Sequence, residues 1–135
     1  MAVKLKPKSF GPVFVLYDST DTLRYAYGDP SEATEYPPVN SPVDTLLASL
    51  ASCIAKSIEI TAASQKASLR PFTVQVDGAK STDLPGRLAK AHITVIGDFV
   101  DDEEQLQKIV KQAKAICTVS NSLTTEITIE TTPDV

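Results

Sequence analysis

The chain has 135 residues, enough for one domain that buries about two-thirds of the surface of its unfolded form. Apolar residues make up 42% and charged residues 22% of the chain, which is the composition of an ordinary globular protein. The net charge of −4 and the absence of tryptophan argue against a nucleic acid or an anionic membrane as the partner.

The first third of the chain is predicted to form short strands. Apolar residues alternate over residues 13–17, a polar turn covers residues 18–21, and a second alternating run covers residues 23–27, which together predict a β-hairpin. A further strand is expected over residues 3–10. Residues 28–40 contain three prolines and no periodicity, so they predict a long loop that covers a site or wraps around a partner.

The clearest predicted element is a helix over residues 41–66. Ser41 suits the N-cap, Pro42 the first helical position and Asp44 the third position of a capping box. Only Lys56 and Glu59 are charged between residues 45 and 63, so this helix is nearly apolar all round and should be covered all round. Its length of about 39 Å is close to the width of a whole domain of this size. We therefore expect a central helix that packs against another helix, which a second subunit could supply.

The second half is predicted to contain three strands and a shorter helix. Alternating apolar residues mark strands at residues 72–76 and 89–95, joined by a turn at residues 81–86, and a last strand at residues 126–130. The helix begins at Asp101 or Asp102 and has an apolar stripe formed by Leu106, Ile109, Val110, Ala113, Ile116 and Cys117. Short turns between neighbouring strands predict an antiparallel sheet, and the expected class is α+β, with one domain over residues 1–135.

Two thiols are the candidate reactive groups. Cys53 and Cys117 are the only cysteines, and both fall on apolar faces of predicted helices. A single cysteine in such a position is typical of a small core residue, whereas a functional pair requires that the two sulfurs meet. The N-terminal residues lack the apolar centre of a secretory signal, and the long helix has an uncharged stretch too short to span a membrane. We therefore expect a cytoplasmic protein, in which a disulfide would be transient.

Two segments resemble a known family. The run SPVDTLLASLASC at residues 41–53, followed by ICTVS at residues 116–120, is similar to the OsmC/Ohr family of osmotically inducible and organic hydroperoxide resistance proteins. The resemblance implies an intertwined homodimer in which antiparallel sheets wrap around two long central helices. It also implies a cysteine-based peroxidase: Cys53 attacks a hydroperoxide as a thiolate and becomes a sulfenic acid, Cys117 resolves it as a disulfide, and a dithiol reduces the disulfide.

The chain departs from the family's peroxidases at two supporting positions. In those proteins a glutamate follows the proline and works with an arginine of the N-terminal strands. Here Val43 follows Pro42 and the acid comes one step later, at Asp44, which a rotation of about 100° around the helix separates from the family's position. We expect Asp44 to cap the helix. Arg24 is the only arginine of the N-terminal strands and is either the catalytic partner or a solvated strand residue.

No other motif in the sequence indicates a cofactor. One histidine, His92, and two distant cysteines do not make a zinc site, and there is no glycine-rich phosphate loop, so we expect neither a metal nor another cofactor. The leading hypothesis is a cytoplasmic homodimeric enzyme that reduces organic hydroperoxides through Cys53 and Cys117. Two alternatives remain open: a non-catalytic dimeric module that binds a small apolar ligand at its interface, with structural cysteines, and a thiol-based sensor that signals to a partner.

Overall fold

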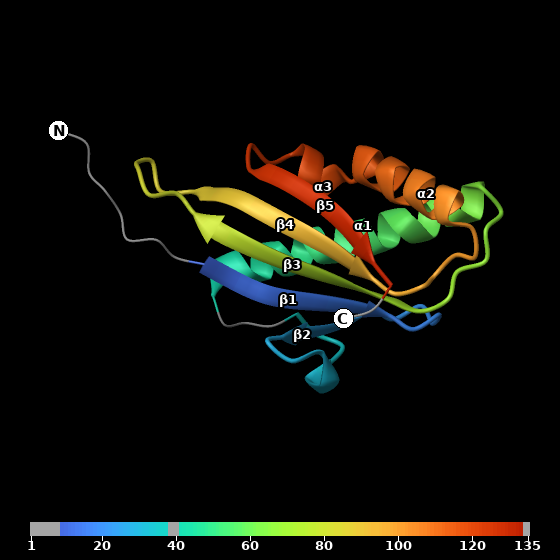
Figure 1. Ribbon diagram of the computed structural model, residues 1–135. Coiled ribbons are helices and arrows are strands. Elements are labelled where there is room, and N and C mark those ends of the chain that lie inside the picture. Colours follow the sequence, from blue (N-terminus) through green and yellow to red (C-terminus); the bar gives the residue numbers. More distant parts are fainter. Residues whose placement is uncertain (1–8, 38–40, 134–135) are drawn as a thin grey trace.

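One five-stranded sheet carries two long helices on one of its faces (Figure 1). The computed structural model describes residues 9–37 and 41–133. The elements in chain order are β1 (Ser9–Tyr17), β2 (Arg24–Tyr27), the 3-10 helix η1 (Pro30–Glu32), α1 (Pro42–Ser64), β3 (Phe72–Lys80), β4 (Leu88–Ile96), α2 (Glu103–Ile116), α3 (Thr118–Asn121) and β5 (Glu126–Thr132). The strands lie in the order β2-β1-β3-β4-β5. This arrangement confirms the α+β class.

Both predicted hairpins are present. β1 pairs with β2 and β3 pairs with β4, each in the antiparallel sense. The strand expected over residues 3–10 lies mostly outside the described residues, and its last two positions open β1 instead. Within the expected loop, Asp29 caps η1 by accepting a hydrogen bond from the backbone N–H of Ser31, and Thr34 forms a β-bridge with Tyr25. The part of this segment that is described is therefore ordered against the edge of the sheet, while residues 38–40 lie outside the description.

The last strand differs from the expectation of a fully antiparallel sheet. β5 runs parallel to β4, with Ile129 opposite Ile93. The reason is the connection: α2 and α3 lie between β4 and β5, and a helical crossover returns the chain to the same end of the sheet, where it enters the next strand in the same direction. Short turns, from which the antiparallel sheet was inferred, are found only within the two hairpins.

The long helix begins as predicted. The Ser41 hydroxyl oxygen accepts a hydrogen bond from the backbone N–H of Asp44 at 3.1 Å, which is the N-cap contact of α1. The helix ends at Ser64, two residues before the predicted end. Lys66 adopts a left-handed backbone conformation with φ of 57°, and the N–H of Ala67 donates to the carbonyl of Ala62 at 2.9 Å. This left-handed turn closes the helix.

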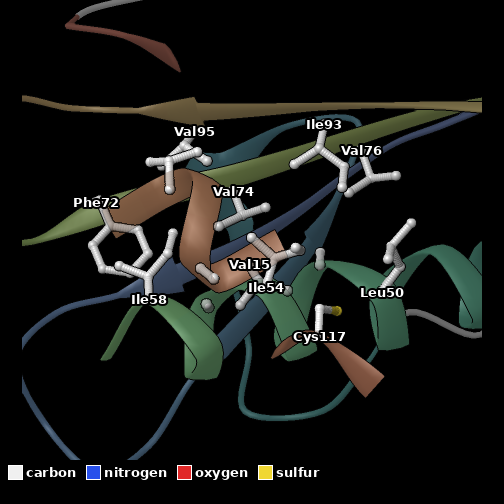
Figure 2. Close-up of a cluster of buried hydrophobic side chains, with 14 of the residues drawn as sticks. Val15, Leu50, Ile54, Ile58, Phe72, Val74, Val76, Ile93, Val95 and Cys117 are labelled. Atoms are coloured by element: carbon white, nitrogen blue, oxygen red, sulfur yellow. The ribbon is translucent and has the colours of Figure 1, made fainter. Parts of the chain in front are cut away.

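The main core lies between α1 and the sheet (Figure 2). The fully buried side chains of this layer share one face of α1 and one face of β1, β3 and β4. They are Leu47, Leu50, Ile54 and Ile58 from the helix and Val13, Val15, Val74, Val76, Ile93 and Val95 from the strands. Burial of each side chain of this size stabilises the fold by about 1.5–3 kcal/mol, so α1 is held firmly against the sheet.

The opposite face of α1 is open in the single chain. Ile60 is 60% exposed, and Ser49, Lys56 and Ala63 are exposed on the same side. By length and composition alone α1 could cross a membrane, but 56% of its most apolar window is buried inside the fold. It is the core helix of this domain. The expectation that it is covered all round is met within one chain where α1 faces the sheet, α2 and α3, and is not met on this open side.

The second helix is shorter than its apolar stripe suggested. Asp102 caps its start, as one of the two predicted residues. Five of the six stripe residues are buried, namely Leu106, Ile109, Val110 and Ala113 within the helix and Cys117 just after it. Ile116 was predicted to be buried but is 40% exposed. The reason is that α2 stops there: Cys117 has an extended backbone, with φ of −72° and ψ of 104°, and a separate short helix, α3, follows.

Candidate active site

Cys53 lies midway along α1, at the border between its buried and open faces. Leu50 and Ser57, one turn to either side of it, are buried, while Lys56 on the open side is exposed. The Cys53 side chain is partly exposed and is a free thiol. A thiol in this position is anchored by the core and is reachable from the open face of the helix.

Cys117 lies at the break between α2 and α3 and serves both helices. It is the C-cap of α2 through its backbone N–H, which donates to the carbonyl of Lys114, and the N-cap of α3 through its sulfur, which accepts from the N–H of Ser120 at 3.4 Å. Its side chain has no exposed surface. Figure 2 shows the sulfur beside Leu50 and Ile54 of α1. The end of α2 thus delivers the second thiol to the helix that carries the first.

Cys53 packs against the core cluster that contains Cys117, and its thiol is among the groups that shift the pKa of Cys117. Burial raises the pKa of Cys117 above that of a free thiol. Hydrogen bonds from Ser120 act in the opposite direction and lower that pKa, while interactions with the Cys53 thiol, through hydrogen bonding and charge, raise it. Interactions of this kind require proximity, so two side chains far apart in the sequence meet in the fold. Both remain free cysteines.

Asp44 lies at the start of α1 and caps it, as expected. One carboxylate oxygen accepts a hydrogen bond from the backbone N–H of Gly11 at 3.1 Å, and the other accepts from the Ser41 hydroxyl at 2.8 Å. The side chain is buried. These contacts join the helix start to β1, and none of them involves a thiol.

Arg24 lies at the sheet edge, on β2. Its Nε atom is 3.7 Å from a carboxylate oxygen of Asp18, and 44% of its side chain is exposed. The pKa of Asp18 is lowered chiefly by hydrogen bonds from Thr20, with a smaller contribution from the charge of Arg24. In the single chain, the ion pair that the structure gives Arg24 belongs to the β1–β2 turn and not to the thiols.

Two further residues lie beside the thiols. Lys56, one turn after Cys53 on α1, is the nearest cation along that helix, and its Nζ atom is 3.5 Å from a carboxylate oxygen of Glu59. Ser120, whose N–H reaches the sulfur of Cys117, was not among the residues that the sequence singled out. The signal that could have found it is its position three residues after Cys117, because residues three apart face each other in a helical turn.

The described part of the chain contains no cluster of three or more histidine, cysteine or acidic side chains that could hold a metal ion. His92 lies on the open face of the sheet. Its Nδ1 atom is 2.6 Å from the Thr128 hydroxyl and its Nε2 atom is 2.9 Å from a carboxylate oxygen of Glu130. It is thus an ordinary polar link between β4 and β5.

The sequence matches a known protein family. The sequence model described as "OsmC-like protein" matches residues 38–132, which include both cysteines. The chain belongs to the OsmC-like family. A search of curated protein sequences finds no relative of the chain.

Solved structures of OsmC-like proteins share the fold. An OsmC-like protein of unknown function from Vibrio cholerae is 22% identical with a TM-score of 0.61, over 82% of this chain and 78% of that one. An OsmC-like protein from Mycoplasma pneumoniae is 13% identical with a TM-score of 0.62, over 98% of each chain. The organic hydroperoxide resistance protein OhrB of Bacillus subtilis is 14% identical with a TM-score of 0.58, over 95% of this chain and 98% of that one. At identities this low, the structural similarity shows a common fold and not a common activity.

Proposed function

We propose that this OsmC-like protein is a thiol-dependent peroxidase that reduces organic hydroperoxides. The observation that carries the proposal is the meeting of Cys53 and Cys117 at the contact between α1 and the α2–α3 break. A structural neighbour from Bacillus subtilis is named an organic hydroperoxide resistance protein, and another, from Jannaschia, an OsmC-like hydroperoxide resistance protein. The names give the substrate class that we propose, and the thiol pair gives the chemistry.

The different environments of the two thiols support different roles. Cys53 is partly exposed, so a hydroperoxide can reach its sulfur, whereas Cys117 has no exposed surface and its pKa is raised by burial. The nucleophile in such chemistry is a thiolate. In our proposal Cys53 is therefore the attacking thiol and Cys117 the resolving thiol.

The proposed reaction has three steps: oxidation of Cys53, formation of the disulfide and reduction of the disulfide. The Cys53 thiolate attacks the distal oxygen of the hydroperoxide, the O–O bond breaks, the alkoxide leaves and takes up a proton, and Cys53 becomes a sulfenic acid. The Cys117 thiolate attacks the Cys53 sulfur, the S–O bond breaks, and hydroxide leaves as water. An external dithiol reduces the resulting disulfide, supplies two electrons and two protons, and is itself oxidised to a disulfide.

We further propose that the working form is a homodimer in the cytoplasm. The open face of α1 carries Ile60, and Cys53 lies at the border of the same face. A second subunit packed on this face would cover Ile60 and leave Cys53 at the edge of the contact, where a hydroperoxide can still reach its sulfur. Arg24 and Asp44 take no part in the chemistry that we propose within one subunit, because their contacts belong to a turn and to a helix cap.

Turnover of cumene hydroperoxide with a dithiol tests the proposal. The wild type should consume the peroxide, and mass spectrometry after one equivalent should find an intramolecular disulfide between Cys53 and Cys117. Cys53→Ser should abolish consumption, and Cys117→Ser should form the sulfenic acid without the disulfide. Ser52→Ala is the matched control, because the hydrogen bond of the Ser52 hydroxyl among the described residues goes to the carbonyl of Ser49 on the same helix. Equal rates in wild type and Cys53→Ser, or no consumption in either, would exclude the peroxidase.

One observation favours a second candidate, a dimeric module that binds a small apolar ligand. A pocket of about 260 Å³ lies at the start of α1. Its lining is mostly apolar, with Phe10, Pro42, Val43 and Leu88, and also includes Lys80 and Arg87. Binding of an apolar fluorescent probe that survives Cys53→Ser and is lost in Val43→Glu would support this candidate. Absence of peroxide consumption together with such binding would replace the peroxidase by the module.

A further inference from the structure

Ser120 holds the Cys117 sulfur through a local turn. In the sequence Cys117-Thr118-Val119-Ser120, the extended backbone of Cys117 places its side chain at the cap of the following turn. The N–H of Ser120 donates to the sulfur at 3.4 Å, and the Ser120 hydroxyl donates to the Cys117 carbonyl at 3.2 Å. Serine therefore contacts the cysteine twice, once at the reactive atom and once at its backbone.

Both residues are buried, and this makes the contact important for the chemistry. Ser120 is 8% exposed and Cys117 has no exposed surface. A thiolate in such a place loses the hydrogen bonds of water, and a donor from the protein offsets part of that cost. Burial raises the pKa of Cys117, and the hydrogen bond from the Ser120 backbone N–H, which reaches the sulfur, lowers it.

We propose that Ser120 is a positioning residue for the resolving thiol: it holds the Cys117 sulfur toward Cys53 and favours its deprotonated form. The inference rests on the proposed function, in which Cys117 attacks the oxidised sulfur of Cys53. In that step the S–S bond forms, the S–O bond of the sulfenic acid breaks, and hydroxide leaves to become water. The sulfenic acid is the oxidant, so the step needs no other redox partner.

Few titratable groups of the described residues act on the Cys117 thiol. From α1 the titratable group that acts on it is Cys53. Lys56 and Glu59, the charged pair on the same helix, bond to each other. From α2, Lys114 contacts Cys117 through its backbone carbonyl, not through its ammonium group. The ionisation of Cys117 therefore depends on burial, on Cys53 and on Ser120.

A titration of Cys117 in the Cys53→Ser protein tests this role without any peroxide chemistry. The thiolate of the remaining cysteine is followed by ultraviolet absorbance against pH. We expect Ser120→Ala to lower the thiolate fraction at a fixed pH by about three- to tenfold, equivalent to a rise of about half to one pKa unit. Ser120→Thr keeps the hydroxyl and should restore the parent titration. The backbone N–H that reaches the sulfur is common to all variants, whereas the hydroxyl bonds to the Cys117 carbonyl and fixes the turn that aims this N–H at the sulfur. The comparison therefore tests whether the turn held by the hydroxyl controls the thiol.

Ser122→Ala is the matched control. Its hydroxyl donates to the carbonyl of Thr118 at 2.8 Å in the same turn and does not contact Cys117. It should leave the titration unchanged. An unchanged midpoint in Ser120→Ala, or an equal shift in Ser122→Ala, would overturn the proposal. If Ser120→Ala does not fold, as judged by circular dichroism, Ser120→Gly removes the same hydroxyl and carries the same expectation.

A second measurement joins the titration to the reaction. In the protein with both cysteines, one equivalent of cumene hydroperoxide should oxidise Cys53 at the same rate in wild type and Ser120→Ala, while disulfide formation slows by the factor found in the titration. Slowing of both steps equally would contradict a role specific to Cys117. If no variant reacts with peroxide, the proposed function fails, but the titration still decides whether Ser120 controls the thiol.

Discussion

The carboxylate of Asp44 accepts a hydrogen bond from the backbone N–H of Gly11 at 3.1 Å, which joins the start of α1 to β1. Its second oxygen accepts from the Ser41 hydroxyl, and its own N–H donates back to Ser41. A negative charge at this end of a helix also interacts favourably with the helix dipole. Asp44 therefore fixes the helix that carries Cys53 against the sheet.

Replacement of Asp44 should lower the stability of the fold and leave the rate of peroxide consumption nearly unchanged. Asp44→Ala leaves the Gly11 N–H and the Ser41 hydroxyl without their acceptor, and we expect a loss of about 1–3 kcal/mol in the free energy of unfolding. Urea denaturation measures this loss. Peroxide consumption per folded molecule should stay within about twofold of wild type. A large loss of rate at unchanged stability would instead give Asp44 a chemical role.

Arg24→Ala should have little effect on stability or on the rate of peroxide consumption. The Arg24 guanidinium is half exposed, and its ion pair with Asp18 spans the β1–β2 turn. Exposed pairs of this kind contribute little to stability. We expect an unchanged denaturation midpoint and an unchanged rate of peroxide consumption at saturating dithiol. A fall in rate of tenfold or more, with Arg24→Lys giving partial recovery, would show that Arg24 reaches the thiols, as the family resemblance allows.

Gly11 is predicted to be intolerant of a side chain. Its φ is +84°, and an added Cβ would lie 2.6 Å from the carbonyl oxygen of Val76 on the neighbouring strand. Gly11→Ala should cost about 1–2 kcal/mol from the backbone conformation and more from the clash. Gly28 is the matched control, because its φ of +81° is similar but an added Cβ would meet no atom within 4 Å. Equal costs of the two substitutions in thermal unfolding would show that the clash is relieved.

The buried thiol of Cys117 predicts a loss of stability at alkaline pH. Burial raises the pKa of Cys117 in the folded state above the value of about 8.5 for a thiol in an unfolded chain. Between the two values the unfolded state binds fewer protons, so stability falls as pH rises through this window and is fully present below it. In Cys117→Ser the slope of unfolding free energy against pH should be smaller in the same window. Equal slopes would mean that Cys117 ionises as easily in the folded state as in the unfolded state.

The elements that the sequence predicted correctly depend on neighbouring residues. Ser41, Pro42 and Asp44 define the start of α1 within four positions, and the hairpin turns lie next to the strands that they join. The direction of β5 was missed because it depends on where a helical crossover returns the chain, which no local pattern encodes. The four-residue helix α3 was missed because its polar residues have no apolar periodicity.

The candidate site likewise has parts that the local sequence predicts and parts that only the fold determines. The two cysteines stood out as chemical groups, but only the fold shows that the end of α2 places Cys117 beside α1. The stripe of α2 suggested that Cys117 belonged to the helix, whereas it is the cap of two helices. This difference gives Ser120 its contact with the sulfur. The supporting residues Asp44 and Arg24 were named from the family pattern, and the contacts that the structure gives them within the chain lie at the helix start and at the β1–β2 turn.

The open face of α1 predicts association with a second copy of the chain. Ser49, Cys53, Lys56, Ile60 and Ala63 recur on it at alternating intervals of four and three residues, the spacing of a helix that packs along another helix. Ile60 is 60% exposed there, and apolar side chains at such a seam gain by burial. We expect the wild type to sediment as a dimer.

Ile60→Glu should shift the sedimenting species toward the monomer, because it would place two like charges at the seam. Leu84→Glu is the matched control: Leu84 is 59% exposed, but it lies in the loop between β3 and β4 and not on the open face of α1. That variant should remain dimeric. Because Cys53 lies on the border of the seam, the monomer formed by Ile60→Glu should also show faster alkylation of Cys53 by iodoacetamide than the wild type. A monomeric wild type, or equal dimerisation of both variants, would mean that α1 is not the interface.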